Sequence, residues 1–238
     1  MTPAHEPGAT HARDVRAMFT RIAHRYDLMN SLMTGGRHHA WRRVAAGAVL
    51  DLPPGPVLDL ATGTADLALD IRRLAPARRV VGADFSEGML REGRRKLVAR
   101  GEGGIALVAA DAQGLPFADA TFAAVTSAFL LRNLADLPGG LAEMRRVTLK
   151  DGAVIALEIV QPTLRGWAPL FNVYFRRFVP MVGALVARDR QAYTYLPRSV
   201  ARFVSPPALT ELMTHVGLRD VHYRRLGLGT IAIHIGRV

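Results

Sequence analysis

Apolar residues follow a helical rhythm near the start of the chain. Across residues 13–33 they recur every three or four positions, which predicts one amphipathic helix that ends at Gly35 and Gly36. A second helix is expected over residues 39–50, before a Pro-Pro-Gly sequence. Residues 1–12 are rich in Pro, Gly, Ala and His and are expected to form a flexible tail.

Farther along the chain, short apolar runs alternate with amphipathic stretches. The expected strands are 57–60, 79–83, 105–110, 122–128, 153–159, 221–224 and 230–235. Helices are expected over residues 66–74, 86–100, 134–149 and 209–216. This alternation predicts an α/β fold in which helices cover both faces of a mostly parallel sheet. The last two strands are expected to pair antiparallel.

The pattern is that of one domain over residues 13–238 with a single interruption. Residues 163–204 break the alternation; they are rich in aromatic residues, Arg and Pro, and predict a lid or substrate-entry insertion. The most apolar stretch within it, 178–187, is far shorter than the roughly 18 or more residues of a membrane span. The N-terminus lacks the basic-then-apolar order of a signal peptide. A soluble or peripheral protein is therefore expected.

Composition adds a charge and excludes some chemistry. The 238 residues are half hydrophobic, enough for a sizeable core, and their formal net charge is +11. This balance favours an anionic partner, which could be a nucleic acid, a membrane surface or an acidic ligand. The chain has no cysteine, which excludes disulfides, thiolate metal sites and a cysteine nucleophile and fits a reducing compartment.

Three strand ends carry candidate binding residues. The sequence V-L-D-L-A-T-G-T-A-D (57–66) joins a strand to a helix through Gly63, where the backbone can approach a ligand. It is neither G-x-G-x-x-G nor a P-loop, so it does not indicate phosphate binding. Asp84 ends the next strand about 20 residues later, where an acid can accept hydrogen bonds from ribose hydroxyls. Asp111 and Ala112 end the third strand, where the acid can reach an adenine amino group. Each acid alone also suits a helix or turn cap.

Together these segments resemble the motifs of class I S-adenosylmethionine (SAM) methyltransferases. The resemblance implies a Rossmann-like sheet of seven mostly parallel strands, SAM as the cofactor and no metal ion. The cofactor-binding residues that it implies are Tyr26, Asn30, Asp59, Gly63, Thr64, Asp84, Phe85, Asp111, Ala112 and Ser127. For Tyr26 and Asn30, a structural role in the N-terminal helix is an equal alternative.

Further blocks narrow the resemblance to the UbiE/MenG family of quinone C-methyltransferases. F-T-R-I-A-H-R-Y-D-L-M-N (19–30) is similar to the family's N-terminal signature, and G-R-H-H-A-W-R-R (36–43) to the block that follows. F-L-L-R-N (129–133) and D-R-Q-A-Y-T-Y-L-P-R-S (189–199) are similar to later blocks, and so is the ending G-T-I-A-I-H-I-G. The resemblance covers about residues 15–236.

The chain departs from the family pattern at the cofactor loop. Thr62 and Ala65 stand where the family has glycines, and each carries a Cβ that makes a left-handed backbone costly. The loop therefore either does not need that conformation or has shifted. Ala128 stands where the family has a serine, and Ser127, one place earlier, points to the opposite face of the strand.

The resemblance implies C-methylation of a reduced prenylated quinone, in which demethylmenaquinol becomes menaquinol. A ring carbon beside a phenolic oxygen attacks the methyl group of SAM, so the protein must align the reactants, exclude water and favour the ring anion. Arg132 and His38 are the expected catalytic residues. Arg132 would stabilise the anion as a permanent cation, and His38 would accept the proton. A solvent-facing Arg and a structural His are the alternatives.

Partners follow from the same resemblance. Peripheral association with the inner face of the cytoplasmic membrane is expected through residues 163–188 and the basic helix at 91–100. A homodimer is possible, and no nucleic-acid partner is expected. The alternatives are a benzoquinol of the ubiquinone pathway, another small or lipophilic acceptor, RNA binding driven by the charge, and a non-catalytic SAM-binding subunit.

Overall fold

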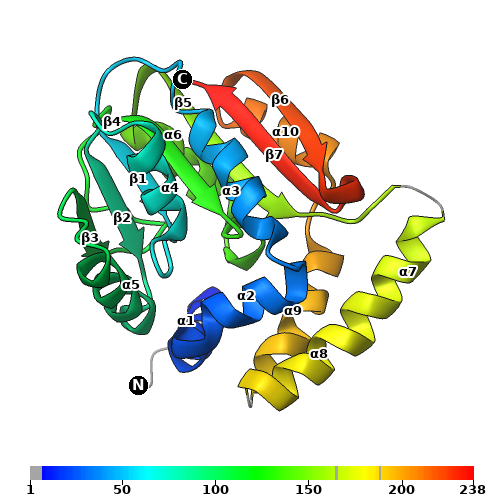
Figure 1. Ribbon diagram of the computed structural model, residues 1–238. Coiled ribbons are helices and arrows are strands. Elements are labelled where there is room, and N and C mark those ends of the chain that lie inside the picture. The colour runs from blue at the N-terminus through cyan, green and yellow to red at the C-terminus, as the bar shows by residue number, and fades with distance from the viewer. Residues whose placement is uncertain (1–6, 164–165, 188) are drawn as a thin grey trace, which may run out of the picture.

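Seven strands form one sheet in the computed structural model, which describes residues 7–163, 166–187 and 189–238 (Figure 1). In order across the sheet they are β3 (Ile105–Ala109), β2 (Val80–Asp84), β1 (Val57–Leu60), β4 (Phe122–Ala128), β5 (Thr148–Ile159), β7 (Ile231–Arg237) and β6 (Arg219–Leu226). The first five are parallel, and β7 runs antiparallel to both neighbours. The predicted mostly parallel sheet is confirmed, together with its antiparallel last pair.

Helices cover both faces of this sheet. One apolar cluster draws on α3 (Arg37–Gly47), α4 (Asp66–Leu74) and α5 (Glu87–Ala99), and the other on α6 (Leu137–Val147) and α10 (Pro206–His215). Strand β5 contributes to both, because successive side chains along a strand point to opposite faces. Its Ile155 and Leu157 belong to the first cluster, and its Val154 and Ala156 to the second.

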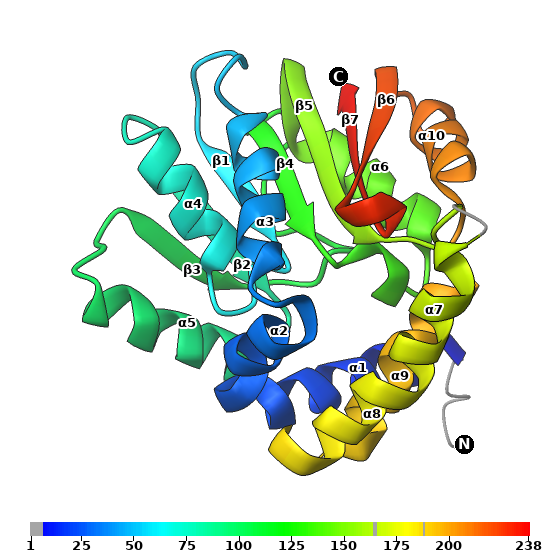
Figure 2. The same cartoon turned by 45° about the vertical axis from the view of Figure 1, so that its right-hand side comes forward.

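A third apolar cluster lies beside the sheet rather than on its faces. It joins α1 (Pro7–Ile22), α2 (Tyr26–Thr34), α8 (Val179–Val182) and α9 (Arg190–Arg202), which Figure 2 shows grouped below the sheet. Helix α7 (Trp167–Val173) continues into α8 through a π-helical stretch at Tyr174–Phe178, and a second such stretch, Gly183–Ala187, follows. The predicted insertion at 163–204 is thus largely helical where it is described.

The N-terminal helices differ from their prediction. The helix expected over 13–33 is two helices, because the 3-10 turn Ala23–Arg25 separates α1 from α2. Helix α1 begins at Pro7, so residues 7–12, expected in the tail, are helical; proline is tolerated in a first turn. Residues 1–6 of the expected tail lie outside the described residues. Helix α3 spans 37–47 rather than 39–50.

Other boundaries shift by a few residues. Helix α6 begins at Leu137 rather than at 134, because Asp136 caps it by accepting a hydrogen bond from the backbone nitrogen of Gly139 at 3.0 Å. Strands β5 and β6 begin earlier than predicted, at Thr148 and Arg219. Within the described parts of the chain, every helix is too short or too polar to span a bilayer.

Candidate active site

A buried carboxylate holds the turn between β1 and α4. Asp59 accepts hydrogen bonds from Thr62 Oγ1 at 2.6 Å and from the backbone nitrogen of Ala68 at 3.1 Å. Burial raises the pKa of Asp59 to about 7, and the hydrogen bonds oppose this shift. A Cβ on Gly82 of β2 would lie 2.8 Å from Thr62 Oγ1, so the threonine fills the space beside that glycine. Thr62 therefore anchors the turn through its hydroxyl.

The left-handed backbone of this turn persists at one of the two altered positions. Ala65 has φ of +68° and Gly63 has φ of +56°, whereas Thr62 lies outside the left-handed region. Ala65 precedes α4 as its N-cap, with its side chain fully buried. The loop thus still needs the strained conformation at Ala65 but not at Thr62.

A cavity lies against the ends of β1, β2, β3 and β4. It encloses about 730 Å³ of empty space, partly open to solvent. The predicted cofactor-binding residues that line it are Tyr26, Gly63, Asp84, Phe85, Asp111 and Ala112. Phe19 of α1 and Met89 of α5 also line it, and neither was expected from the sequence. Carboxyl ends of parallel strands are where α/β sheets bind ligands.

Two backbone N–H groups hold the Asp84 carboxylate at this cavity. Its Oδ2 accepts a hydrogen bond from the backbone nitrogen of Gly63 at 2.8 Å, and its Oδ1 accepts one from that of Ser86 at 2.8 Å. Burial raises the pKa of Asp84 to about 6, and these two bonds oppose the shift. Each oxygen keeps a lone pair for a ribose hydroxyl. Asp111 also caps a turn, since Oδ1 accepts from the backbone nitrogen of Gln113 at 2.9 Å.

A smaller recess of about 290 Å³ shares Tyr26 and Gly63 with this cavity. Asp59 and Thr64, two further predicted residues, line the recess with Arg42. Arg42 is almost fully buried although it is charged. Asp59 and Thr64 therefore lie beside the first cavity and do not line it.

A network of charges closes the recess and ties α2 to α4 and α5. Asp66 lies 2.7 Å from Arg42 Nη1 and 2.6 Å from Lys96 Nζ. Lys96 also lies 2.5 Å from Asp27 Oδ2, and Thr64 Oγ1 donates to Asp27 Oδ1 at 2.6 Å. Burial raises the pKa of Asp66, but Arg42 and Lys96 outweigh it and lower that pKa. Lys96, which belongs to the basic helix predicted at 91–100, is paired with these acids, and only 15% of its side chain is exposed.

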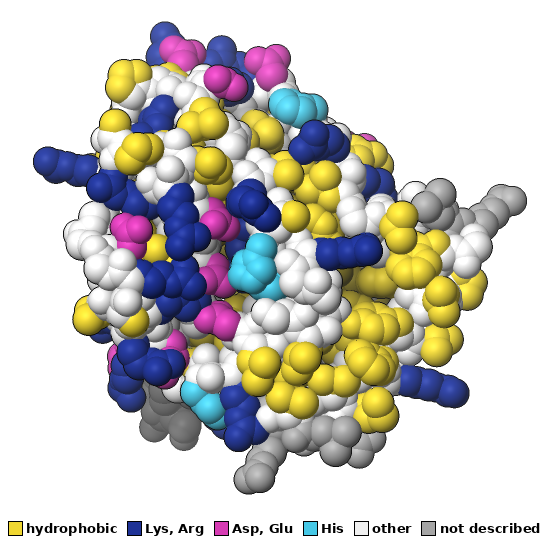
Figure 3. All heavy atoms as spheres, in the orientation of Figure 1, with side chains coloured by type: hydrophobic (Ala, Val, Ile, Leu, Met, Phe, Trp, Pro, Cys, Tyr) yellow, Lys and Arg dark blue, Asp and Glu magenta, His cyan; other side chains and the backbone are white. Residues whose placement is uncertain are grey.

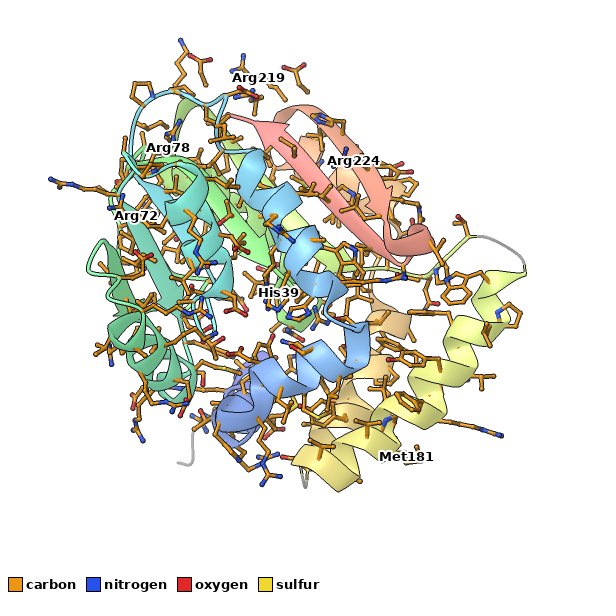
Figure 4. The ribbon with its side chains drawn as sticks, in the orientation of Figure 1. His39, Arg72, Arg78, Met181, Arg219 and Arg224 are labelled. Atoms are coloured by element: carbon orange, nitrogen blue, oxygen red, sulfur yellow. The ribbon has the colours of Figure 1, made fainter. Side chains whose placement is uncertain are left out.

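One group of side chains has the composition of a metal site. His38, His39 and Asp66 place ligand atoms within 4.8 Å of one another, and Figure 4 shows His39 at the start of α3 in the middle of the molecule. However, Asp66 already accepts hydrogen bonds from Arg42 and Lys96, and these two cations oppose a bound metal ion. The group therefore offers little to a divalent cation.

A second cavity, with about 770 Å³ of empty space that is partly open to solvent, adjoins the first. The two share Phe19, Tyr26 and Phe129, and the lining of the second is mostly apolar. Both expected catalytic residues, His38 and Arg132, line it. Four of its lining residues carry a buried polar atom that has no hydrogen-bond partner among the described residues: Asn30 Nδ2, His38 Nε2, Arg132 Nε and the Tyr193 hydroxyl. Such atoms are costly to bury unless a ligand satisfies them.

The surroundings of His38 keep its imidazole ring neutral. Its ring is almost fully buried, and Nδ1 lies 2.7 Å from Thr34 Oγ1. Burial lowers the pKa of His38 to about 4, and Arg42 and His39 contribute in the same direction. Its ring centroid lies 3.9 Å from that of His39. The neutral ring can accept a hydrogen bond at Nε2, but this lowered pKa means that a nearby ligand anion must stabilise the imidazolium if His38 takes up a proton.

Arg132 is not the free cation that was expected. Its Nη1 lies 2.9 Å from Glu158 Oε2, and both side chains are buried. Glu158 Oε1 also accepts a hydrogen bond from the backbone nitrogen of Leu131 at 2.6 Å. Burial raises the pKa of Glu158, and Arg132 opposes this shift. The pair is neutral overall, so Arg132 can donate a hydrogen bond from Nε but offers little net charge.

Two predicted cofactor residues lie elsewhere. Asn30 lines the second cavity and not the first. Ser127 is buried within β4 and lines none of the three cavities described above, and its hydroxyl has no partner within residues 7–163, 166–187 and 189–238. Ala128, the next residue, lines the first cavity, as strand alternation requires. The structure therefore separates Ser127 from the cofactor-binding group.

The sheet order, with a cavity at the carboxyl ends of its parallel strands, is the fold of class I SAM-dependent methyltransferases. The fold is shared with a SAM-dependent methyltransferase from Aquifex aeolicus: the TM-score is 0.64 at 14% identity, covering 89% of this chain and 98% of that one. Tyr26, Asp84 and Phe85, three of the predicted cofactor-binding residues, line the cavity at these strand ends.

Comparison of sequences identifies the family. The model of the ubiE/COQ5 methyltransferase family matches residues 8–238. A protein from Thermus thermophilus named demethylmenaquinone methyltransferase is 44% identical over 92% of this chain and 99% of its own length. A ubiquinone/menaquinone biosynthesis C-methyltransferase UbiE from Desulfotalea psychrophila is 43% identical over 93% of this chain and 89% of its own length. The chain belongs to the ubiE/COQ5 methyltransferase family, as the sequence blocks predicted.

Proposed function

We propose that this enzyme transfers the methyl group of SAM to a ring carbon of a reduced prenylated quinone, converting demethylmenaquinol to menaquinol. The observation that carries the proposal is the second cavity, whose apolar walls suit a fused ring and whose unpartnered polar atoms suit two ring oxygens. It adjoins the first cavity, which is lined by predicted cofactor-binding residues, and methyl transfer requires donor and acceptor to be adjacent. The name of the Thermus thermophilus relative favours the naphthoquinol acceptor.

The chemistry then follows from the residues of the two cavities. His38 accepts the proton of a ring hydroxyl, directly or through water, and Arg132 Nε donates a hydrogen bond to a ring oxygen. The adjacent ring carbon forms a bond to the methyl carbon as the sulfur–methyl bond breaks, and S-adenosylhomocysteine leaves as the thioether. The proton on that carbon then passes to solvent, which restores the aromatic ring, and the ring oxygen takes back the proton held by His38, so that one proton is released per turnover. The protein supplies alignment, exclusion of water and a base.

Methyl transfer to defined acceptors tests this proposal. Purified enzyme is incubated without oxygen with methyl-labelled SAM and a chemically reduced short-chain demethylmenaquinone, and the product is measured by mass spectrometry. A parallel reaction contains the corresponding demethylated benzoquinol. Faster methylation of the naphthoquinol supports the proposal, and faster methylation of the benzoquinol would assign the enzyme to the ubiquinone branch. SAM binding without turnover on either ring would indicate a non-catalytic subunit.

We also propose that the enzyme lies on a lipid surface through α7, the π-helical stretch 174–178 and α8. Side chains on these segments are apolar and exposed: Leu170, Val173, Phe178 and Met181. Figure 3 shows hydrophobic side chains gathered over α7 and α8, and Figure 4 shows Met181 on the outer side of α8. Arg176 and Arg177 are exposed on the same stretch and suit anionic headgroups. Phe175, between the exposed positions, lines the second cavity, which would let a prenyl chain pass from lipid to that cavity.

Co-sedimentation with vesicles tests the lipid-facing surface. Binding to vesicles containing anionic phospholipid is expected to exceed binding to phosphatidylcholine vesicles and to fall as salt is added. Met181→Glu should weaken binding severalfold. Leu50→Glu, at a comparably exposed leucine outside the surface, should leave it unchanged. Equal binding of both variants would place the membrane contact elsewhere.

A further inference from the structure

Thr34 lies between Asn30 and His38 and hydrogen-bonds to both. Its Oγ1 is 2.7 Å from the backbone oxygen of Asn30 and 2.7 Å from Nδ1 of His38. The hydroxyl carries one proton, and a carbonyl oxygen can only accept. If Thr34 gave its proton to His38, two oxygens would face each other at 2.7 Å without a proton between them. Both contacts are satisfied only if Thr34 donates to Asn30 and His38 Nδ1–H donates to Thr34.

This arrangement fixes which ring nitrogen of His38 carries the proton. A neutral imidazole has one N–H, so Nε2 must present a lone pair and can act only as an acceptor. Nε2 has no partner among the described protein groups. His38 and Thr34 both line the second cavity. The Thr34 hydroxyl therefore fixes Nε2 of His38 as a hydrogen-bond acceptor in this cavity.

Arg132 supplies a hydrogen-bond donor to the same cavity. Its Nε is a donor only, is buried and has no partner in the part of the chain that the structure describes. Its Nη1 donates to Glu158 and to the backbone oxygen of Phe129. A quinol offers both hydroxyl donors and oxygen acceptors, so it satisfies His38 and Arg132 together. A quinone offers only oxygen acceptors, which satisfy Arg132 and oppose the Nε2 lone pair.

We propose that Thr34 is a positioning residue that fixes the tautomer of His38. The second cavity thereby selects the reduced ring over the oxidised ring. The inference rests on the proposed function for the identity of the acceptor. The oxidised form, which cannot be methylated by this route, is thus kept from occupying the site. The discrimination does not require a change in the shape of the cavity, because the two rings are nearly the same size.

Nitrogen NMR of histidine-labelled enzyme tests the lock without any ligand. The signals of His38 are assigned from a His38→Gln sample. In the wild type, Nδ1 should show the shift of a protonated nitrogen and Nε2 that of an unprotonated one. Thr34→Val, which keeps the size but removes the hydroxyl, should mix the two tautomers, and Thr34→Ser should restore the wild-type pattern. A protonated Nε2 in the wild type would overturn the proposal.

Binding of two probes tests the selection. Menadiol and menadione are titrated calorimetrically without oxygen in the presence of S-adenosylhomocysteine; the absence of cysteine removes thiol adducts of the quinone. Wild type and Thr34→Ser should bind menadiol at least about tenfold more tightly than menadione, the scale of one unsatisfied buried hydrogen bond. Thr34→Val should reduce that ratio to near one. Equal wild-type affinities would overturn the selection, whereas no binding of either ring would instead contradict the proposed quinol acceptor.

Discussion

Removing Arg132 should destabilise the protein in a way that depends on pH. Glu158 is 1% exposed, and Arg132 is the cation of its ion pair, so Arg132→Met leaves a carboxylate buried without its counter-charge. Losing one partner of a buried pair costs about 3–5 kcal/mol of unfolding free energy. This loss is expected in full at pH 8, where Glu158 must either stay ionised in an apolar site or bind a proton.

Acidification should recover much of the loss. In the variant the folded-state pKa of Glu158 lies above the unfolded value of 4.5, so the native state binds more protons. Stability then rises as pH falls through the folded pKa, by about 1.4 kcal/mol per unit until the unfolded pKa is reached. Between pH 8 and pH 5, the recovery can therefore equal most of the initial cost.

Urea unfolding followed by circular dichroism at pH 8 and pH 5 measures both the loss of unfolding free energy and its recovery. Glu158→Gln placed in the Arg132→Met background removes the buried charge and should restore most of the stability at pH 8. The double variant then isolates chemistry from folding, and its turnover should be lower by about 100-fold if the Arg132 hydrogen bond stabilises the ring anion. A single variant equally stable at both pH values, with no recovery from Glu158→Gln, would refute the compensated pair.

The remaining predictions concern cofactor binding, the base and the turn. Asp84→Ala should weaken SAM binding by about 10–150-fold, the loss of a charge-assisted hydrogen bond of roughly 1.5–3 kcal/mol, while Asp119→Ala, outside the cavity, should not change it; calorimetry decides this. Because the pKa of Asp84 is about 6, wild-type SAM affinity should fall as pH drops below 6, and an affinity independent of pH from 7 to 5 would contradict the role of the carboxylate. His38→Phe should lower turnover by about 100–10,000-fold with SAM affinity retained, as seen by assay and titration together. Gly82→Ala should lower the unfolding free energy by about 1–3 kcal/mol in chemical denaturation, because the new Cβ meets Thr62.

The strand core was predictable because it is encoded locally. Parallel strands buried on both faces are continuous apolar runs, and β1, β2 and β4 follow that pattern within a residue or two. The same locality located Gly63, which follows β1, and Asp84, which is the last residue of β2. These two residues, which belong to segments that resemble family motifs, also line the same cavity.

The charged partnerships were not predictable from local pattern. Glu158 and Arg132 are 26 residues apart, and Lys96 is far in sequence from Asp27, so no spacing rule joins them. One signal was present: Glu158 is the single acid in the apolar run 153–159, and such a residue is buried only when it is paired. The break between α1 and α2 likewise depends on packing against α5 and α9, which are distant in the chain.

The quinones of a living cell test the central claim most directly. A menaquinone-producing strain that lacks its own methyltransferase for this step is compared with the same strain carrying this gene, and extracted quinones are identified by mass spectrometry. The account predicts that demethylmenaquinone accumulates in the first strain and that menaquinone returns in the second, but not with the Asp84→Ala variant. Persistent demethylmenaquinone in cells that contain the folded wild-type enzyme would contradict the account.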